Sequence, residues 1–136
     1  MKVKYEDSIE YKVWKFIEGL GGNIVLRSDL SGLAMDRQIT RALNSLVEKN
    51  RLAKIGYGVY AKLQYSELGE MFYMPGGLLG NTREALTRLG IRWTLSAAEQ
   101  DYNGGLTQQV PVSPRTKLLD RFRRKLTYAG REMRFE

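Results

Sequence analysis

Apolar residues recur with helical spacing in two stretches of the N-terminal half of the chain. Between residues 7 and 20 they fall at i, i+4, i+7, i+8 and i+11, the positions of Ile9, Val13, Phe16, Ile17 and Leu20. Between residues 36 and 50 they fall at i, i+3, i+4, i+7 and i+8, the positions of Ile39, Ala42, Leu43, Leu46 and Val47. Each pattern predicts an amphipathic helix with one face in a core.

The ends of these two helices carry the residues that usually cap helices. Asp7 or Ser8 can cap the first helix, and Gly21 with Gly22 ends it. Asp36 begins the second helix, and Asn50 is expected to end it in the left-handed conformation.

The segments around the second helix are shorter and apolar. Residues 24–26 predict a strand, and residues 29–33 predict a short helix capped by Ser28 or Asp29. Residues 52–62 form two β-prone runs about the turn Gly56-Tyr57-Gly58, which predicts a hairpin. The order helix, strand, short helix, helix, hairpin predicts a winged helix-turn-helix over residues 1–63.

The second half follows a different pattern. Residues 75–81 are rich in glycine and predict a loop, after which Thr82 is expected to cap a short helix over residues 82–90. Residues 91–95 predict a strand, residues 96–104 a helix capped by Ser96, and the C-terminal tail a hairpin about Ala129-Gly130. We therefore expect an α+β protein, with a small mixed α/β region over residues 64–136.

The charge and the residue types that are absent limit the classes of function that this chain can have. The 136 residues include 22 Lys and Arg against 15 Asp and Glu, a net charge of +7 that favours a polyanionic partner. The absence of Cys and His removes disulfides, thiolate metal sites and the commonest general base. We expect no enzyme, and hence no catalytic residue, cofactor or metal site. The chain shows neither a signal peptide nor a long apolar run, so we expect a cytoplasmic protein without a membrane partner.

The polar face of the helix over residues 36–50 is the main candidate for binding double-stranded DNA. Arg suits guanine, Gln and Asn suit adenine, and the N-terminal half of a recognition helix usually reads the bases. The predicted contacts on this face are Arg37, Gln38, Arg41, Asn44 and Ser45. The plain alternative is that any amphipathic helix needs a polar outer face.

Further contacts are expected outside this helix. The predicted wing offers Lys54, Tyr57 and Lys62 to the DNA backbone or minor groove, and Ser28 can seat a phosphate at the start of the short helix. A dense basic run near the C-terminus can contact phosphates or simply form a solvated edge; it comprises Arg121, Arg123, Arg124 and Lys125.

Two stretches resemble the AbiEi-type antitoxin family of type IV toxin-antitoxin systems. The hairpin RLAKIGYGVYAKL is similar to that family's "L-x-R-L-x-x-G-V-Y" element through Leu52, Lys54, Ile55, Gly58, Val59 and Tyr60. LSAAEQDYNGGLTQQVPV is similar to a second family stretch through Ser96, Ala98, Gly105, Leu106, Thr107, Gln109, Val110 and Pro111. The C-terminal stretch RKLTYAGREMRFE resembles the family's basic β-hairpin.

The resemblance carries expectations about function. It implies an N-terminal winged-helix domain that binds operator DNA and represses its own operon, and a second region that neutralises a nucleotidyltransferase-like toxin. Family members usually continue past the residue matching Glu136, so this chain is expected to be truncated relative to them. In addition, Asp101-Tyr102-Asn103 replaces a more apolar run of the family.

Several alternatives stay open. The chain can be a protein-interaction module that uses the winged helix as a scaffold, or an RNA-binding protein, and it can form a homodimer. A nucleotide-binding loop is disfavoured because Asn81 stands where PGGLLGNT would need lysine. Glu99 and Asp101 are two residues apart and would not share a helix face, which disfavours a paired-carboxylate site.

Overall fold

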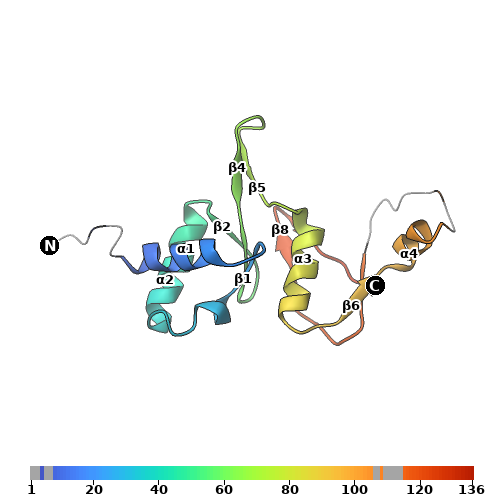
Figure 1. Ribbon diagram of the computed structural model, residues 1–136, viewed down its shortest axis with the longest axis horizontal. Helices are drawn as coiled ribbons and strands as arrows, with labels where there is room; N and C mark the ends of the chain where they lie inside the picture. Colours follow the sequence, from blue (N-terminus) through green and yellow to red (C-terminus); the bar gives the residue numbers. More distant parts are fainter. Residues whose placement is uncertain (1–3, 5–7, 106–107, 109–114) are drawn as a thin grey trace.

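The computed structural model describes residues 4, 8–105, 108 and 115–136, which form an α+β structure (Figure 1). Within these residues the chain has four α-helices, one short 3-10 helix and four small antiparallel sheets. The expected α+β class is confirmed at this level. Asp7, Leu106, Thr107, Gln109, Val110 and Pro111, which the sequence singled out, lie outside the described residues.

The N-terminal elements follow the predicted order. They are α1 (Ile9–Gly19), β1 (Ile24–Leu26), η2 (Arg27–Leu30), α2 (Asp36–Glu48), β2 (Leu52–Gly56) and β3 (Val59–Lys62). The Ser8 side chain caps α1 by accepting a hydrogen bond from the Tyr11 N–H at 3.1 Å. Asn50 adopts the left-handed conformation after α2, with φ of 59°. Both predicted caps are therefore confirmed.

The short helix lies earlier than predicted and is a 3-10 helix over Arg27–Leu30. The Asp29 carboxylate accepts a hydrogen bond from the Leu26 N–H at 2.9 Å, which closes a tight turn at this point. Gly32 follows with φ of +89°, a conformation that ends a helix. The prediction of a helix over residues 29–33 and of a Ser28 cap is wrong.

The first sheet, in the order β1-β3-β2, is buried on both of its faces. Successive residues of a strand point to opposite faces. On one face Val25, Leu52 and Tyr60 join α1 and α2 in the first cluster, whose other buried members are Val13, Ile17, Leu30, Ile39, Ala42, Leu43 and Leu46. On the other face the sheet joins the second cluster, formed by Ile24, Leu26, Ala53, Ile55, Val59, Ala61, Met74, Ala85 and Leu126. This sheet is thus the central layer of the structure.

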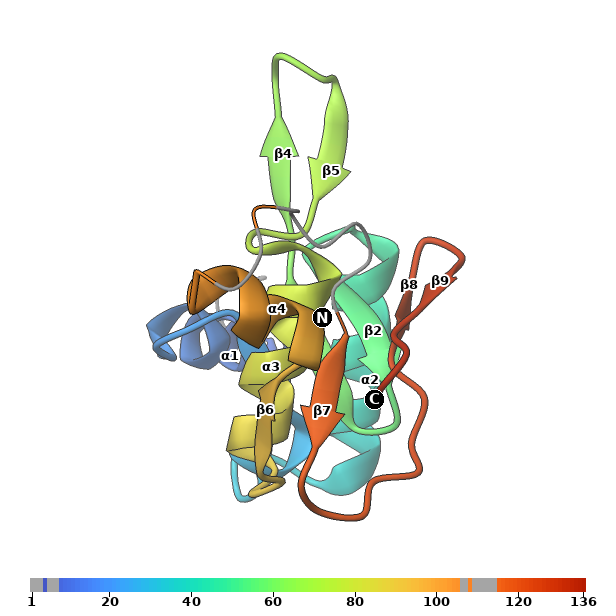
Figure 2. The same ribbon diagram turned by 90° about the vertical axis from the view of Figure 1, so that its right-hand side faces the viewer.

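The second half contributes the remaining elements. They are β4 (Gln64–Ser66), β5 (Met71–Tyr73), α3 (Gly77–Arg88), β6 (Trp93–Leu95), α4 (Ala97–Asn103), β7 (Thr116–Leu118), β8 (Thr127–Tyr128) and β9 (Arg131–Glu132). Figure 2 shows β7 beside β6, and the β8–β9 hairpin beside β2. The predicted strand, the Ser96-capped helix and the hairpin about Ala129-Gly130 are confirmed.

The predicted Thr82 cap is wrong, because α3 begins at Gly77 and Thr82 lies buried inside it. Gly76 precedes the helix at φ of 86°, which a side chain would disfavour. The Asn81 amide donates to the carbonyl oxygens of Pro75 and Gly77 at 2.8 and 2.7 Å, so the first turn of α3 is fixed by a side chain. Because of these contacts, α3 begins within the glycine-rich segment for which the sequence predicted a loop.

α3 is fastened to the first sheet by polar contacts around the second cluster. The Glu84 carboxylate accepts from the N–H groups of Asn23 and Ile24 at 3.0 and 2.6 Å. Arg88 donates to the Ile24 carbonyl at 3.2 Å and pairs with Asp29. Residues from both sides of position 63 therefore share one core.

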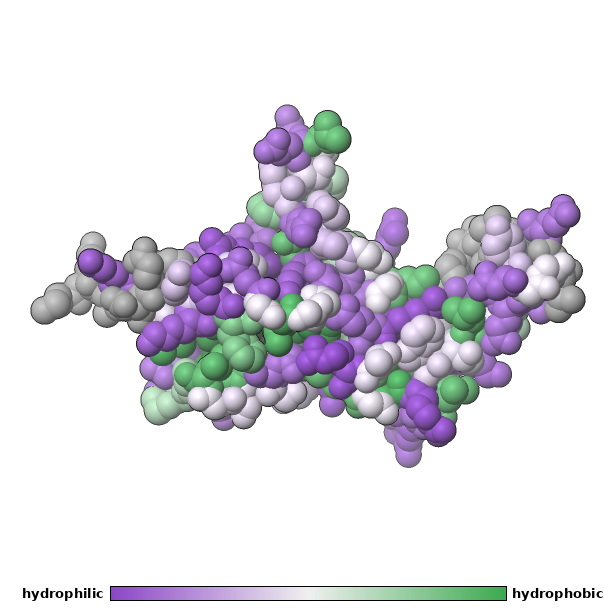
Figure 3. Space-filling view, viewed as in Figure 1, coloured by the Kyte–Doolittle hydropathy of each residue, from purple (hydrophilic) through white to green (hydrophobic). Residues whose placement is uncertain are grey.

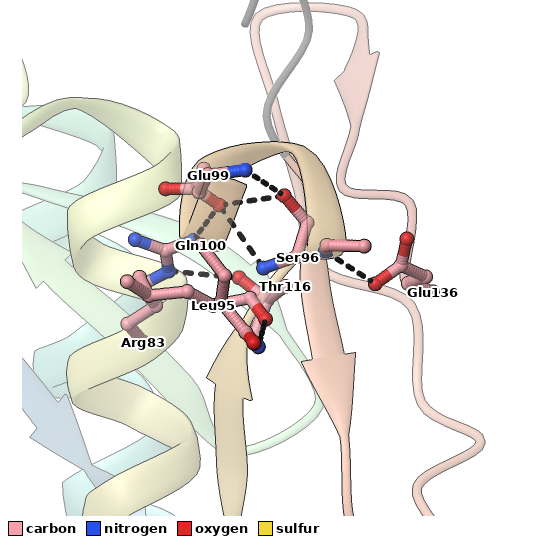
Figure 4. A network of polar contacts seen from close by, with 8 residues as sticks. Arg83, Leu95, Ser96, Glu99, Gln100, Thr116 and Glu136 are labelled. Carbon is pink, nitrogen blue, oxygen red and sulfur yellow. Dashed lines mark hydrogen bonds and ion pairs between the residues drawn. The ribbon is translucent and has the colours of Figure 1, made fainter. Parts of the chain in front are cut away.

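A second polar network holds α4 and the β6–β7 sheet to α3 (Figure 4). Arg83 donates to the Thr116 hydroxyl at 2.9 Å and to the Glu99 carboxylate at 2.6 Å, and its guanidinium lies 5.0 Å from the Trp93 ring centre. Burial raises the pKa of Glu99, but its hydrogen bonds to Arg83 and Ser96 outweigh burial and leave the pKa below its usual value. The network is structural, since it joins residues of α3, α4 and β7 to one another.

Candidate nucleic-acid interface

The outer face of α2 carries the predicted basic and amide side chains. Its inner face buries Ile39, Ala42, Leu43 and Leu46, which fixes the rotation of the helix. Arg37, Arg41 and Asn44 are consequently exposed on the opposite side. No acidic ion-pair partner holds either arginine within the described part of the chain, so both guanidinium groups are presented to solvent.

Gln38 and Ser45 lie at the edge of this face and are half-buried. The Gln38 amide oxygen accepts a hydrogen bond from the Met35 N–H at 3.1 Å, so the side chain caps the start of α2. Both residues line a shallow groove between α2 and the beginning of α1, together with Ile9, Glu10 and Arg41. Gln38 would have to leave its capping contact to reach a base.

Arg27 joins the start of α2 to the turn of the β2–β3 hairpin. Its backbone N–H donates to the Gly58 carbonyl at 2.9 Å, and its guanidinium donates to the Asp36 carbonyl at 3.0 Å. The hairpin turn and the N-terminal turn of α2 are therefore neighbours. Tyr57, at the tip of this turn, is 81% exposed.

The two lysines of the hairpin have different positions. Lys54 is exposed and pairs across the strands with Tyr60, so it points to the α2 side of the sheet. Lys62 is half-buried, and its ammonium donates to the carbonyl oxygens of Leu20 and Gly22 at 2.9 and 3.1 Å. Lys62 lies at the end of β3 away from the turn, so the structure does not bring it together with Tyr57.

The C-terminal basic segment crosses the hairpin turn. The Arg124 guanidinium donates to the Tyr57 carbonyl at 3.4 Å. Leu126 is fully buried in the second cluster, and both its side chain and the Lys125 carbonyl press against Gly56. A Cβ atom at Gly56 would lie 2.7 Å from Leu126 Cδ2 and 2.9 Å from the Lys125 oxygen, so glycine allows this close approach.

This segment has two apolar side chains packed against the rest of the protein and four cationic side chains that are exposed. Phe122 and Leu126 pack into the second cluster, and the cations between and beside them are exposed, namely Arg121, Arg123, Arg124 and Lys125. Three of the arginines line a shallow hollow floored by Leu89, Ile91 and Phe122. Lys125 lies 3.9 Å from Glu132, a solvent-exposed pair of little energetic weight.

The sequence pointed to these cations but not to their position against the β2–β3 hairpin. The signal that could have shown it was the pair of apolar residues Phe122 and Leu126, one within the basic run and one directly after it.

Ser28 is exposed within the short 3-10 helix, where its carbonyl accepts a hydrogen bond from the Ser31 N–H at 3.3 Å. The Asp29 carboxylate occupies the capping position instead. Asp29 is also paired with Arg88, so its carboxylate is held within the structure, and Ser28 stays an exposed predicted contact beside it.

We also searched the described residues for a metal site, a membrane-spanning helix and a pair of carboxylates. Among residues 4, 8–105, 108 and 115–136, no three Asp or Glu side chains gather closely enough to hold a metal ion. In the same residues no helix is both long and apolar enough to cross a membrane. Glu99 and Asp101 both belong to α4, where Glu99 is occupied by Arg83.

The comparisons with known proteins add no assignment. No protein-family model, no curated protein and no solved structure matches this chain. The exposed face of α2, the neighbouring hairpin turn and the basic segment across it therefore stand as a candidate nucleic-acid interface on their geometry alone.

Proposed function

We propose that this protein binds duplex DNA sequence-specifically through a winged helix-turn-helix formed by residues 9–62. In this proposal η2 and α2 are the two helices of the helix-turn-helix, α2 enters the major groove, and the β2–β3 hairpin is the wing. The element order and the sheet order β1-β3-β2 support it, because β1 and the wing then form one sheet behind the recognition helix.

The observation that carries the proposal is the Arg27 link between the start of α2 and the wing turn. A recognition helix contacts bases through its N-terminal half while adjoining groups hold the phosphates. Arg37 and Arg41 occupy that half and are exposed, and Tyr57 is exposed at the linked turn. Asn44 stands one turn further along the same face as a reader of adenine.

The C-terminal segment adds phosphate contacts beside the wing. Arg124 is hydrogen-bonded to the Tyr57 carbonyl in the wing turn, and the other exposed cations are its neighbours in the sequence. We assign Arg121, Arg123, Arg124 and Lys125 to sequence-independent contacts with the DNA backbone, because exposed cations on long side chains suit phosphates rather than base edges.

The biological role proposed is that of an antitoxin-type repressor of its own operon. This step depends on the resemblance of the hairpin over residues 52–60 and of residues 96–111 to the AbiEi-type family. By the same resemblance the region after residue 63 would neutralise a nucleotidyltransferase-like toxin.

The proposal is tested by fluorescence anisotropy with a labelled duplex from the region upstream of the gene. Arg37→Ala and Arg41→Ala are each expected to weaken binding to the preferred duplex by about 1–3 kcal/mol, and to weaken binding to a scrambled duplex less. Lys117→Ala is the matched control, because Lys117 is exposed on β7, which pairs with β6 at the other end of the molecule from α2 (Figure 1).

Two results would contradict the proposal. One is equal affinity of the wild-type protein and both arginine variants for every duplex. The other is a clear preference for single-stranded RNA that is lost in Tyr57→Ala, since stacking on exposed aromatic rings is typical of RNA recognition.

A further inference from the structure

The hollow between the end of α3 and the basic segment has an apolar floor. Leu89, Ile91 and Phe122 form this floor and are half-buried. Leu89 and Phe122 also pack against the second cluster, which fixes the floor in place. Figure 3 shows hydrophobic groups next to hydrophilic groups on the surface where α3 ends and β6 begins. The volume of the hollow is about 380 Å³, within the range of about 300–1,000 Å³ that is typical of small-molecule sites.

The charged residues that line this hollow are arginines. Arg121, Arg123 and Arg124 belong to its lining and are exposed, and no Asp or Glu is among the described residues that line it. None of the three arginines forms an ion pair within the described part of the chain. Asp120, which directly precedes them in the sequence, is paired with Arg92. The hollow is therefore positively charged and suits an anion.

Contacts with the DNA backbone would use these arginines but would leave the apolar floor without a partner. Covering apolar surface is favourable, and small-molecule sites usually combine an apolar lining with a few charged groups that orient the ligand. The planar guanidinium group matches the two oxygens of a carboxylate especially well. A ligand that uses both parts of the hollow therefore has an apolar body and one carboxylate.

We propose that this hollow binds a small aliphatic carboxylate. Its carboxylate group pairs with the arginines, and its hydrocarbon chain lies on Leu89, Ile91 and Phe122. Arg124 also donates to the Tyr57 carbonyl in the wing turn, so the hollow adjoins the wing. Because the same arginines are assigned to the DNA backbone, the carboxylate and the duplex compete for them. The competition depends on the proposed DNA binding, whereas the ligand site itself does not.

The site is tested without DNA by titrating the full chain with octanoate and following the backbone amide signals by NMR. The signals of Ile91, Phe122 and Arg123 are expected to shift and to saturate. Acetate carries the charge without the hydrocarbon chain, and 1-octanol carries the chain without the charge. Each is expected to bind about tenfold more weakly than octanoate. No saturable shift at these residues, or equal binding of octanoate and either control compound, would overturn the proposal.

Variants separate the two parts of the hollow. The double variant Arg121→Gln/Arg123→Gln is expected to weaken octanoate binding about tenfold, because it removes two of the three cations. Ile91→Thr keeps the branched shape of the side chain but makes the floor more polar, and is expected to weaken binding about threefold. Arg131→Gln is the matched control, since Arg131 is exposed on β9 and is not among the residues that line the hollow. Unchanged affinity in both hollow variants, or an equal loss in the control, would contradict the site.

Competition with DNA is measured by anisotropy of the labelled duplex in octanoate and in sodium acetate of the same concentration. Octanoate is expected to weaken duplex binding by the wild-type chain more than acetate does, and this difference is expected to disappear in Arg121→Gln/Arg123→Gln. Duplex affinity that is the same in both salts while octanoate is bound would overturn the competition. A chain that binds octanoate but no duplex would refute the DNA-binding proposal and leave the ligand site standing.

Discussion

Removing Arg124 isolates the contribution of the basic segment to DNA binding. Arg124 is exposed, and its only hydrogen bond among the described residues goes to the Tyr57 carbonyl at 3.4 Å. Arg124→Ala therefore removes one cation beside the wing with little disturbance of the core. Leu126 and Phe122 still anchor the segment through the second cluster.

The magnitude follows from counterion release. Each neutralised phosphate contributes about 0.9 to the slope of log affinity against log salt concentration. Seven exposed cations lie on α2, the wing and the basic segment: Arg37, Arg41, Lys54, Arg121, Arg123, Arg124 and Lys125. If each contacts one phosphate, the slope is about −6, and Arg124→Ala changes it to about −5. Between 50 and 200 mM salt this difference amounts to about threefold in relative affinity.

The assay is anisotropy of a labelled duplex titrated at five salt concentrations. Wild type, Arg124→Ala and the control Lys117→Ala are measured side by side. The expected result is a reduced slope for Arg124→Ala and an unchanged slope for Lys117→Ala. Equal slopes for Arg124→Ala and wild type, or the same reduction in both variants, would refute the placement of the basic segment on the DNA.

Three further predictions concern the fold that carries this surface. Gly56→Ala is expected to cost about 1–3 kcal/mol of unfolding free energy in urea and to lower the salt slope, because its Cβ would collide with Leu126 and the Lys125 carbonyl; unchanged stability would contradict that contact. Thr82→Val is expected to add up to about 1 kcal/mol, since the Thr82 hydroxyl is buried without a partner in the described part of the chain; a loss of stability would reveal one. Hydrogen bonds from Arg92 hold the pKa of Asp120 at about 2, below its ordinary 3.8, so the stabilisation that they give is complete well above pH 3.8 and is lost as the pH falls through 2. Asp120→Asn should therefore unfold at lower urea than wild type at pH 6, and the difference should be much smaller at pH 2; a difference of the same size at both pH values would be inconsistent with this carboxylate's role.

The elements that local patterns predicted well are those whose apolar face is long. α2 repeats its apolar residues over 13 residues, and its exposed face followed directly from that period. The Ser8 and Ser96 caps were also readable, because a serine before a helical period is a local signal.

The missed elements depend on contacts between distant residues. The start of α3 was hidden by its glycines and is fixed by the Asn81 amide. The β4–β5 hairpin lacks an alternating pattern, since Met71, Phe72 and Tyr73 are consecutive apolar residues. The position of the basic segment depends on the fit of Leu126 against Gly56, about which no local pattern carries information.

The central claim is that α2 presents Arg37 and Arg41 to a DNA groove. Its most direct test is selection of duplexes from a random pool by the wild-type protein and by Arg41→Ala. The account predicts that the wild type enriches a defined sequence and that Arg41→Ala loses preference at one position of it while the rest stays selected. No enrichment by the wild type, or an identical selected sequence for both proteins, would contradict it.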